Sequence, residues 1–279
     1  MRRLTQLFIS LAFLTGCAST SDLVCELEIE PMSVTPSLTI SHLDSVPIRN
    51  SEREEEVFNT LHALGCDVSL QNLPHGRGAN VICTITGESD EEILIAAHHD
   101  RLGSGRGVAD NWTGITILLD LATHYLKHPP IHTIRLVAFA DEENDMRGSY
   151  HYVRQLKRGR GTRPRVMVNI DTVGVGALRL DYRSSPELAC VARAVGDTHD
   201  VPLPSPRLSN MAGDWEPFMA KGIPVLHFHS LDDRSMGMLH TYRDRRDLVN
   251  DRRLSQALGI IAGTISALDH GIDLTLSVD

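Results

Sequence analysis

The chain has 279 residues, of which 42% are hydrophobic and 23% are charged, and its formal net charge is −9 at pH 7. This balance excludes an intrinsically disordered chain, because there is enough apolar material to form a core. The acidic charge argues against nucleic acid as a partner and against a face that lies flat on a membrane.

Residues 1–16 have the layout of a secretory signal peptide. Arg2 and Arg3 precede an apolar stretch that ends in small residues, and this stretch is too short to remain as a membrane-spanning helix. The alternative is a buried N-terminal helix, but no polar face interrupts the run. Loss of this segment with its two arginines would change the net charge from −9 to −11.

The end of the segment, LTGC at residues 14–17, resembles the lipobox of bacterial lipoproteins. The resemblance implies that Cys17 is lipidated and becomes the new N-terminus. Ala18 and Ser19 follow, without the aspartate that retains such proteins at the inner membrane. We therefore expect a protein of the cell envelope, anchored in the outer membrane and facing the periplasm, with the lipid as its only membrane contact.

Residues 17–45 are expected to form this lipidated N-terminus and a polar tether. The cysteines beyond Cys17 have spacings that match no metal-binding motif; they are Cys25, Cys66, Cys83 and Cys190. Cys66 and Cys83 flank a predicted two-strand unit at residues 66–73 and 79–87. A disulfide between these two cysteines and a pair of buried free thiols both remain open.

From residue 50 onward, helical patterns alternate with short apolar strands. Residues 50–65 carry Val57, Leu61 and Leu64 at helical spacing behind Ser51, a candidate cap. Further strands are expected at 92–98, 133–140, 165–171 and 223–229, and further helices at 112–128 and 247–270. Such alternation predicts a three-layer α/β domain, with a central, mostly parallel (mixed) sheet and helices on both faces. The early strand pair would be an antiparallel extension, and no linker divides the domain.

Three of the predicted strands end in side chains that can bind metals. The first ends in His98, His99 and Asp100, the second in Asp141, Glu142 and Glu143, and the third in Asp171. A glycine-rich loop at 105–114 contributes Asp110, and His240 follows the last strand. Ligands in open α/β sheets collect beyond the carboxyl ends of the strands.

Each of these residues also has an ordinary structural interpretation. A histidine at a strand end is usually solvated or hydrogen-bonded, Asp110 and Asn111 are typical helix caps, and Asp171 is typical of a turn. These interpretations are independent of one another, so they leave the shared location unexplained. A pair of divalent metal ions explains it, because zinc binds imidazole and carboxylate ligands and a carboxylate bridges two ions.

The order of the motifs resembles the M28 family of binuclear zinc exopeptidases over residues 46–279. The motifs are HHD, GVADNWTG, EENDMRGS, VNID and HTYRD, beginning at residues 98, 107, 142, 168 and 240. The resemblance implies a zinc-exopeptidase-like peptidase domain and an aminopeptidase that hydrolyses N-terminal residues from peptide substrates. The implied cofactors are two Zn²⁺ ions.

Position by position, the resemblance implies a metal site and a catalytic pair. His98 and Asp171 would hold one ion, Glu143 and His240 the other, and Asp110 would bridge them. Asp100 would orient His98 through its second ring nitrogen. Glu142 would be the general base that takes a proton from water and passes it to the departing amine. His99 is expected to be structural.

The sequence departs from the family pattern at two places. Leu239 stands where many relatives have a tyrosine that stabilises the oxyanion, and Tyr242 lies on the other side of His240. Trp215 replaces a histidine after Asp214, which is expected to be a structural or site-wall residue. Two alternatives remain: a glutaminyl cyclase-like enzyme with a single zinc ion, and a non-catalytic binding module of the same fold.

Overall fold

The computed structural model describes residues 40–156, 163–209 and 211–271. The signal peptide and lipobox predicted for residues 1–17, and most of the predicted tether, lie outside the described residues and stay predictions. Within the described ranges, no helix is both long enough and apolar enough to cross a bilayer.

The centre of the molecule is a seven-stranded mixed sheet with the order β1-β2-β4-β3-β5-β7-β6. The four central strands β4, β3, β5 and β7 are parallel, and β1, β2 and β6 run antiparallel to their neighbours. The strands are β1 (Asp67–Asn72), β2 (Ala79–Ile85), β3 (Ser89–His98), β4 (His132–Phe139), β5 (Val166–Ile170), β6 (Arg179–Leu180) and β7 (Val225–His229). The predicted early pair is β1 and β2, which extend one edge of the sheet.

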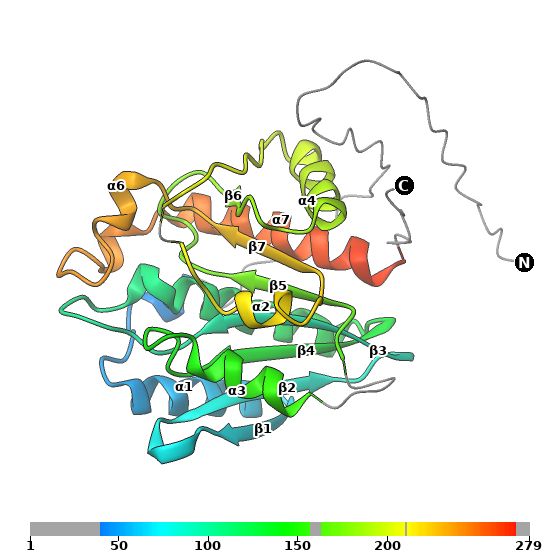
Figure 1. The fold of residues 1–279 in the computed structure, drawn as a ribbon, viewed down its shortest axis with the longest axis horizontal. Coiled ribbons are helices and arrows are strands. Elements are labelled where there is room, and N and C mark those ends of the chain that lie inside the picture. Colours follow the sequence, from blue (N-terminus) through cyan, green and yellow to red (C-terminus); the bar gives the residue numbers. More distant parts are fainter. Residues whose placement is uncertain (1–39, 157–162, 210, 272–279) are drawn as a thin grey trace, which may run out of the picture.

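Helices cover both faces of this sheet (Figure 1). The larger core cluster draws apolar residues from α1 (Asn50–Ala63), α2 (Thr113–Lys127), α4 (Pro186–Thr198) and α7 (Asp251–Asp269). The smaller cluster, on the opposite face, includes residues of α3 (Arg147–Gln155) and α5 (Glu216–Met219). The remaining helical segments are η1 (Ser41–Leu43), η2 (Pro74–Gly76), η3 (Val108–Trp112), α6 (Asp233–Met236) and η4 (Arg246–Leu248).

The two faces follow from the alternation of side chains along each strand. In β3, Ile93 and Ile95 belong to the larger cluster, whereas Leu94 and Ala96 belong to the smaller one. Both faces are therefore buried, which explains the continuous apolar runs in the sequence. The predicted three-layer α/β fold is confirmed.

One local prediction at the start of the domain is wrong. Ser51 was expected to cap the first helix, but the cap position is Arg49, whose backbone N–H is held by the Glu52 side chain. Ser51 lies inside α1. The reason is that the helix already begins at Asn50, one residue before the serine.

The open question about the cysteines is answered for one pair. Cys66 and Cys83 form a disulfide, with their Cα atoms 5.8 Å apart. The bond joins the residue just before β1 to β2. In the sheet register Val68 of β1 lies opposite Cys83, so the start of β1 is close to Cys83.

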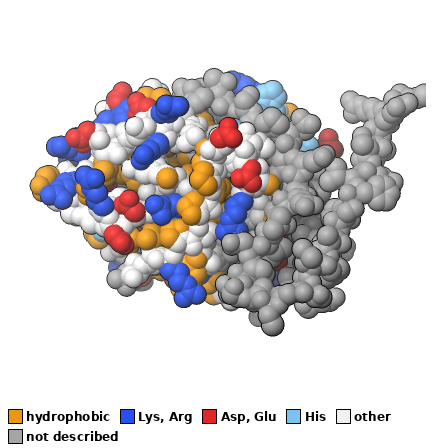
Figure 2. Space-filling model, turned by 90° about the horizontal axis from the view of Figure 1, so that it is seen from above, with side chains coloured by type: hydrophobic (Ala, Val, Ile, Leu, Met, Phe, Trp, Pro, Cys, Tyr) orange, Lys and Arg blue, Asp and Glu red, His pale blue; other side chains and the backbone are white. Residues whose placement is uncertain are grey.

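The surface charge is uneven. Figure 2 shows a face on which arginine and lysine side chains lie among apolar ones and are more prominent than acidic side chains, although the chain carries a formal net charge of −9. Part of the acidic excess is instead buried, since Asp100, Asp110, Asp214 and Asp244 are each at most 6% exposed.

Candidate metal centre

The candidate site lies at the carboxyl ends of three neighbouring parallel strands. β3 ends at His98, and its neighbours β4 and β5 are followed by the Asp141–Glu143 segment and by Asp171. Parallel neighbours place their carboxyl ends at the same edge of a sheet. The fold therefore brings together side chains that are far apart in the sequence.

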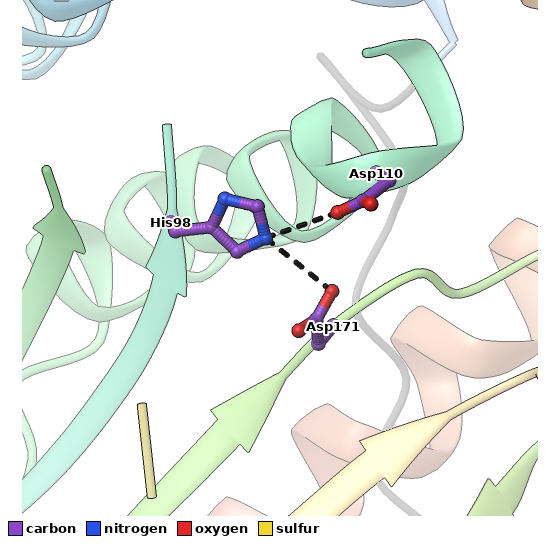
Figure 3. A group of neighbouring side chains, drawn as sticks. All are labelled: His98, Asp110 and Asp171. Atoms are coloured by element: carbon purple, nitrogen blue, oxygen red, sulfur yellow. Dashed lines mark ion pairs between the residues drawn. The ribbon is translucent and has the colours of Figure 1, made fainter. Parts of the chain in front are cut away.

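The first group of ligands consists of His98, Asp110 and Asp171. His98 Nε2 lies 3.1 Å from Asp110 Oδ1 and 3.6 Å from Asp171 Oδ1. Figure 3 shows the His98 ring with this nitrogen directed toward both carboxylates. The three side chains come from β3, from η3 and from the residue after β5.

The second group consists of Asp110, Glu143 and His240. His240 Nε2 lies 3.1 Å from Asp110 Oδ2 and 2.7 Å from Glu143 Oε2. Asp110 therefore contacts one histidine with each of its carboxylate oxygens. All five residues that the family resemblance implied as ligands are in these two groups, with Asp110 common to both.

The two groups fit divalent metal ions. In each group the ligand atoms lie within 4.8 Å of one another, and the donors are imidazole nitrogens and carboxylate oxygens, which zinc binds. Glu143 Oε1 is buried and has no hydrogen-bond partner. An unpaired buried carboxylate oxygen is costly unless a cation lies beside it.

Without a metal ion, protons on the histidines balance the buried acids. Hydrogen bonds to Asp110 and Glu143 raise the pKa of His240 to about 10. Burial opposes the charged form of His98, but the carboxylates of Glu142 and Asp171 outweigh it and raise its pKa well above the usual value. Bound metal ions would take the place of these protons.

Glu142 lies beside both groups without belonging to either. Its Oε2 is 3.9 Å from His98 Nε2, and its side chain is 13% exposed. Burial raises its pKa well above the usual range, and the negative charges of Asp214 and Asp171 add to this rise. A carboxyl group with a raised pKa beside a candidate metal site has properties that suit a general base and acid.

Asp100 supports this edge of the sheet through two kinds of contact. Its Oδ1 lies 3.6 Å from His98 Nδ1, the second ring nitrogen, which is also 3.3 Å from the Asp100 carbonyl. Its carboxylate accepts the backbone N–H groups of Glu142 at 3.0 Å and of Glu143 at 3.2 Å. Asp100 thus links the first histidine to the two glutamates that follow β4.

Asp110 is held by Asp244, which we did not single out from the sequence, and by Asn111, which we considered only as a helix cap. Asp244 accepts the backbone N–H of Ala109 at 2.7 Å and that of Asp110 at 3.4 Å. Asn111, joined to Asp110 by a cis peptide bond, donates to the Ile170 carbonyl at 2.9 Å. The signal was present, because Asp244 ends the HTYRD motif and Asn111 follows Asp110 in the GVADNWTG motif.

The remaining residues considered from the sequence lie outside both groups. Trp215 is buried, and Tyr242 is 67% exposed. His99 is buried with its Nε2 3.1 Å from the Ala79 carbonyl, which agrees with a structural role. Asp214 is also buried, and neither of its carboxylate oxygens has a hydrogen-bond partner.

Sequence comparison relates the chain to known peptidases. Residues 80–265 match the profile of Peptidase family M28. Aminopeptidase YwaD of Bacillus subtilis is 34% identical over 82 residues, which cover 29% of this chain and 18% of the relative. An aminopeptidase of Pseudomonas aeruginosa is 29% identical over 34% of this chain and 18% of its own length. The chain thus spans less than a fifth of the length of these curated relatives.

Two solved structures share the fold. BSAP, a zinc aminopeptidase from Bacillus subtilis, superposes with a TM-score of 0.62 and 24% identity, covering 68% of this chain and 50% of BSAP. A Zn-dependent exopeptidase from Parabacteroides distasonis superposes with a TM-score of 0.72 and 14% identity, covering 85% of this chain and 99% of that protein. The superposition covers nearly the whole of the Parabacteroides distasonis protein, so the two chains share one domain architecture.

Proposed function

The chain belongs to peptidase family M28, and from that membership we propose that it is a zinc-dependent aminopeptidase that removes N-terminal residues from peptides. The main observation behind this proposal is that the two ligand groups share Asp110 and that Glu142 lies beside them. The named relatives support this reading, because two of them are aminopeptidases and a structural neighbour is a zinc aminopeptidase.

Five residues would hold two zinc ions: His98 and Asp171 one, Glu143 and His240 the other, with Asp110 between them. When bound, such a pair of ions polarises the scissile carbonyl and lowers the pKa of water. Glu142 accepts a proton as the water oxygen bonds to the carbonyl carbon. It then delivers that proton to the nitrogen as the carbon–nitrogen bond breaks. Asp100 keeps Glu142 in place through the backbone N–H that it accepts.

The first experiment is elemental analysis of the full-length chain, purified in detergent without chelators. About two zinc ions per chain, with hydrolysis of an aminoacyl p-nitroanilide, would support the proposal. About one ion, with cyclisation of an N-terminal glutamine, would support the cyclase alternative. A chain that binds no zinc after zinc is resupplied would contradict both and favour a binding module.

The role of Glu142 is tested by Glu142→Gln, which keeps the size of the side chain but removes its ability to accept a proton. We expect kcat to fall about 10²–10⁴-fold while the chain keeps about two zinc ions. Asp141→Asn is the matched control, since Asp141 is the adjacent acid and pairs with Arg77 and Arg147 instead. Unchanged turnover in Glu142→Gln would show that another group is the base.

We also propose that the protein is attached to the outer membrane through lipid on Cys17 and faces the periplasm. The disulfide between Cys66 and Cys83 supports an oxidising compartment. On this proposal, peptides are the substrates, nucleic acid is not a partner, and the lipid is the only membrane contact. Cys17→Ala should move the protein from the membrane fraction to the soluble fraction, whereas Cys25→Ala should not. A membrane-bound Cys17→Ala protein would contradict lipid anchoring at this residue.

A further inference from the structure

Arg53 is an unusual residue in α1. The helix presents most of its charged side chains to solvent, but Arg53 is 0% exposed. Burial of an arginine is costly unless its donors find acceptors. The contacts of Arg53 therefore indicate why the fold keeps a cation at this position.

The guanidinium of Arg53 donates to four main-chain carbonyl groups. Its Nε donates to the His99 carbonyl, and its Nη2 donates to the Gly107 carbonyl at 3.0 Å. Its Nη1 donates to the carbonyls of Arg106 at 3.3 Å and Pro47 at 3.4 Å. The planar fork of arginine can reach several fixed acceptors at once, which a lysine ammonium cannot do with the same geometry.

Three of these four carbonyls, those of His99, Arg106 and Gly107, belong to the two segments that carry the candidate metal ligands. His99 lies between His98 and Asp100, and Gly107 precedes η3, which contains Asp110. One side chain therefore connects the end of β3 to the start of η3. The two segments hold the nitrogen and the oxygen that approach each other to 3.1 Å in the first ligand group.

The surroundings of Arg53 are shaped around the guanidinium. The Trp112 ring lies against it, with the guanidinium carbon 4.6 Å from the ring centre, a cation–π arrangement. Gly107 has a φ of +62°, and a Cβ at this position would lie 2.7 Å from Arg101 Cβ and 3.1 Å from Arg53 Nη1. A side chain at residue 107 would push the loop away from the arginine.

Arg53 also places a fixed positive charge behind the acidic site. Burial lowers its pKa to about 10, and the charges of Asp100, Asp110 and Asp244 oppose that fall. The guanidinium is therefore charged at neutral pH. By charge alone, it would weaken the binding of a cation in front of it, since like charges repel.

We propose that Arg53 is a positioning residue, which holds the loop of His98 and the loop of Asp110 at the separation that a shared metal ion requires. This inference rests on the proposed metal site. Positioning by Arg53 would strengthen zinc binding, whereas the positive charge of Arg53 would weaken it. Loss of Arg53 should weaken zinc binding if positioning dominates and strengthen it if charge dominates.

The test compares Arg53→Met and Arg53→Lys with the wild type, all as full-length chains. Arg193→Met is the matched control, because Arg193 also donates to a main-chain carbonyl, that of Leu203, but lies on α4. Zinc affinity is measured by competition with a chromophoric chelator. Thermal unfolding of the metal-free proteins and kcat and KM for an aminoacyl p-nitroanilide are measured in parallel.

We expect Arg53→Met to bind zinc about 10–100-fold more weakly than the wild type, with kcat lowered about 10²-fold and KM little changed. Arg53→Lys retains the charge but cannot reach all four carbonyls, so its zinc affinity should also fall. Arg193→Met should bind zinc as the wild type does. If Arg53→Met does not fold, the zinc affinity of Arg53→Lys relative to the wild type still tests the proposal.

Three results would overturn the inference. Zinc binding by a folded Arg53→Met or Arg53→Lys protein that equals or exceeds wild-type binding would show that Arg53 does not position the ligands, and would leave the proposed aminopeptidase intact. A wild-type chain that binds no zinc would overturn both proposals. Lower melting temperature with unchanged zinc affinity and kcat would assign Arg53 to stability alone.

Discussion

Asp110 and Asn111 are adjacent in the sequence but have different roles in the structure. Asp110 faces both ligand groups, whereas Asn111 accepts the backbone N–H of Gly114 at 3.0 Å, as a residue near a helix start often does. From the sequence, Asp110 could be a metal ligand or a helix cap, whereas Asn111 was considered only as a cap. The outcome depends on the backbone, because both residues leave helical geometry inside η3, with φ −112° and ψ 94° at Asp110 and φ −133° and ψ 44° at Asn111. Propensity cannot predict such a local departure.

Asp214 gives a pH-dependent prediction at the residue scale. Burial raises its pKa to about 7 from a normal value of 3.8. Between about pH 4 and 7, the unfolded chain has released this proton while the folded chain retains it, so the contribution of Asp214 to stability falls as pH rises. Asp214→Asn stays neutral. Relative to the wild type, it should gain about 2–4 kcal/mol in unfolding free energy between pH 4 and pH 8.

Urea unfolding of the metal-free proteins at both pH values measures this difference. Asp90→Asn is the control, since Asp90 is exposed, and its effect on stability should be small at either pH. A constant difference between Asp214→Asn and the wild type would show that Asp214 ionises in the folded state as it does in the unfolded chain.

At the scale of elements, the long periodic segments were predictable and the short ones were not. The patterns at 112–128 and 247–270 correspond to α2 and α7. α5 and α6 have four residues each and β6 has two, which is too short to show a period. α4 escaped prediction for another reason. Its pattern was simply not recognised in the sequence, although most of its residues are buried and it packs against β7 and α7.

The loop before η4 connects the last ligand to the rest of the site through Asp244. This residue follows His240 in the same loop and holds the backbone of Ala109 and Asp110. Asp244→Ala removes that link, so the two halves of the second ligand group lose their fixed separation. We expect zinc affinity to fall about 10–100-fold, measured by chelator competition.

Asp247→Ala is the control in the adjacent η4, because Asp247 pairs with Arg245 at an exposed position. Its zinc affinity should equal that of the wild type. An unchanged zinc affinity in Asp244→Ala would show that the loop keeps its position without the carboxylate.

At the scale of the whole molecule, the Cys66–Cys83 disulfide should contribute measurably to stability. The two cysteines are 17 positions apart, and a loop of this size corresponds to about 3 kcal/mol. The Cys66→Ala, Cys83→Ala double variant should therefore unfold at lower urea concentration than the wild type in the absence of reductant. Equal stability of oxidised wild type and double variant would contradict the prediction.

The sequence predicted that several strand ends meet, but it did not predict which contacts hold the His240 loop there. That loop packs against residues 101–107, where a Cβ on Gly103 would lie within 2.1 Å of the His240 carbonyl oxygen. His240 itself has a φ of +58°. Contacts between irregular segments have no periodic signature, so only the folded structure shows them.

The five candidate ligands come from five separate segments, between residues 98 and 240. No short stretch of chain contains either complete ligand group, so the first group forms only when the sheet has assembled, and the second group also needs the His240 loop. Metal acquisition must then follow folding, and the metal that is loaded is chosen among those available where the chain folds. For a chain exported unfolded, the supply of zinc outside the cytoplasm would decide how much of it becomes active.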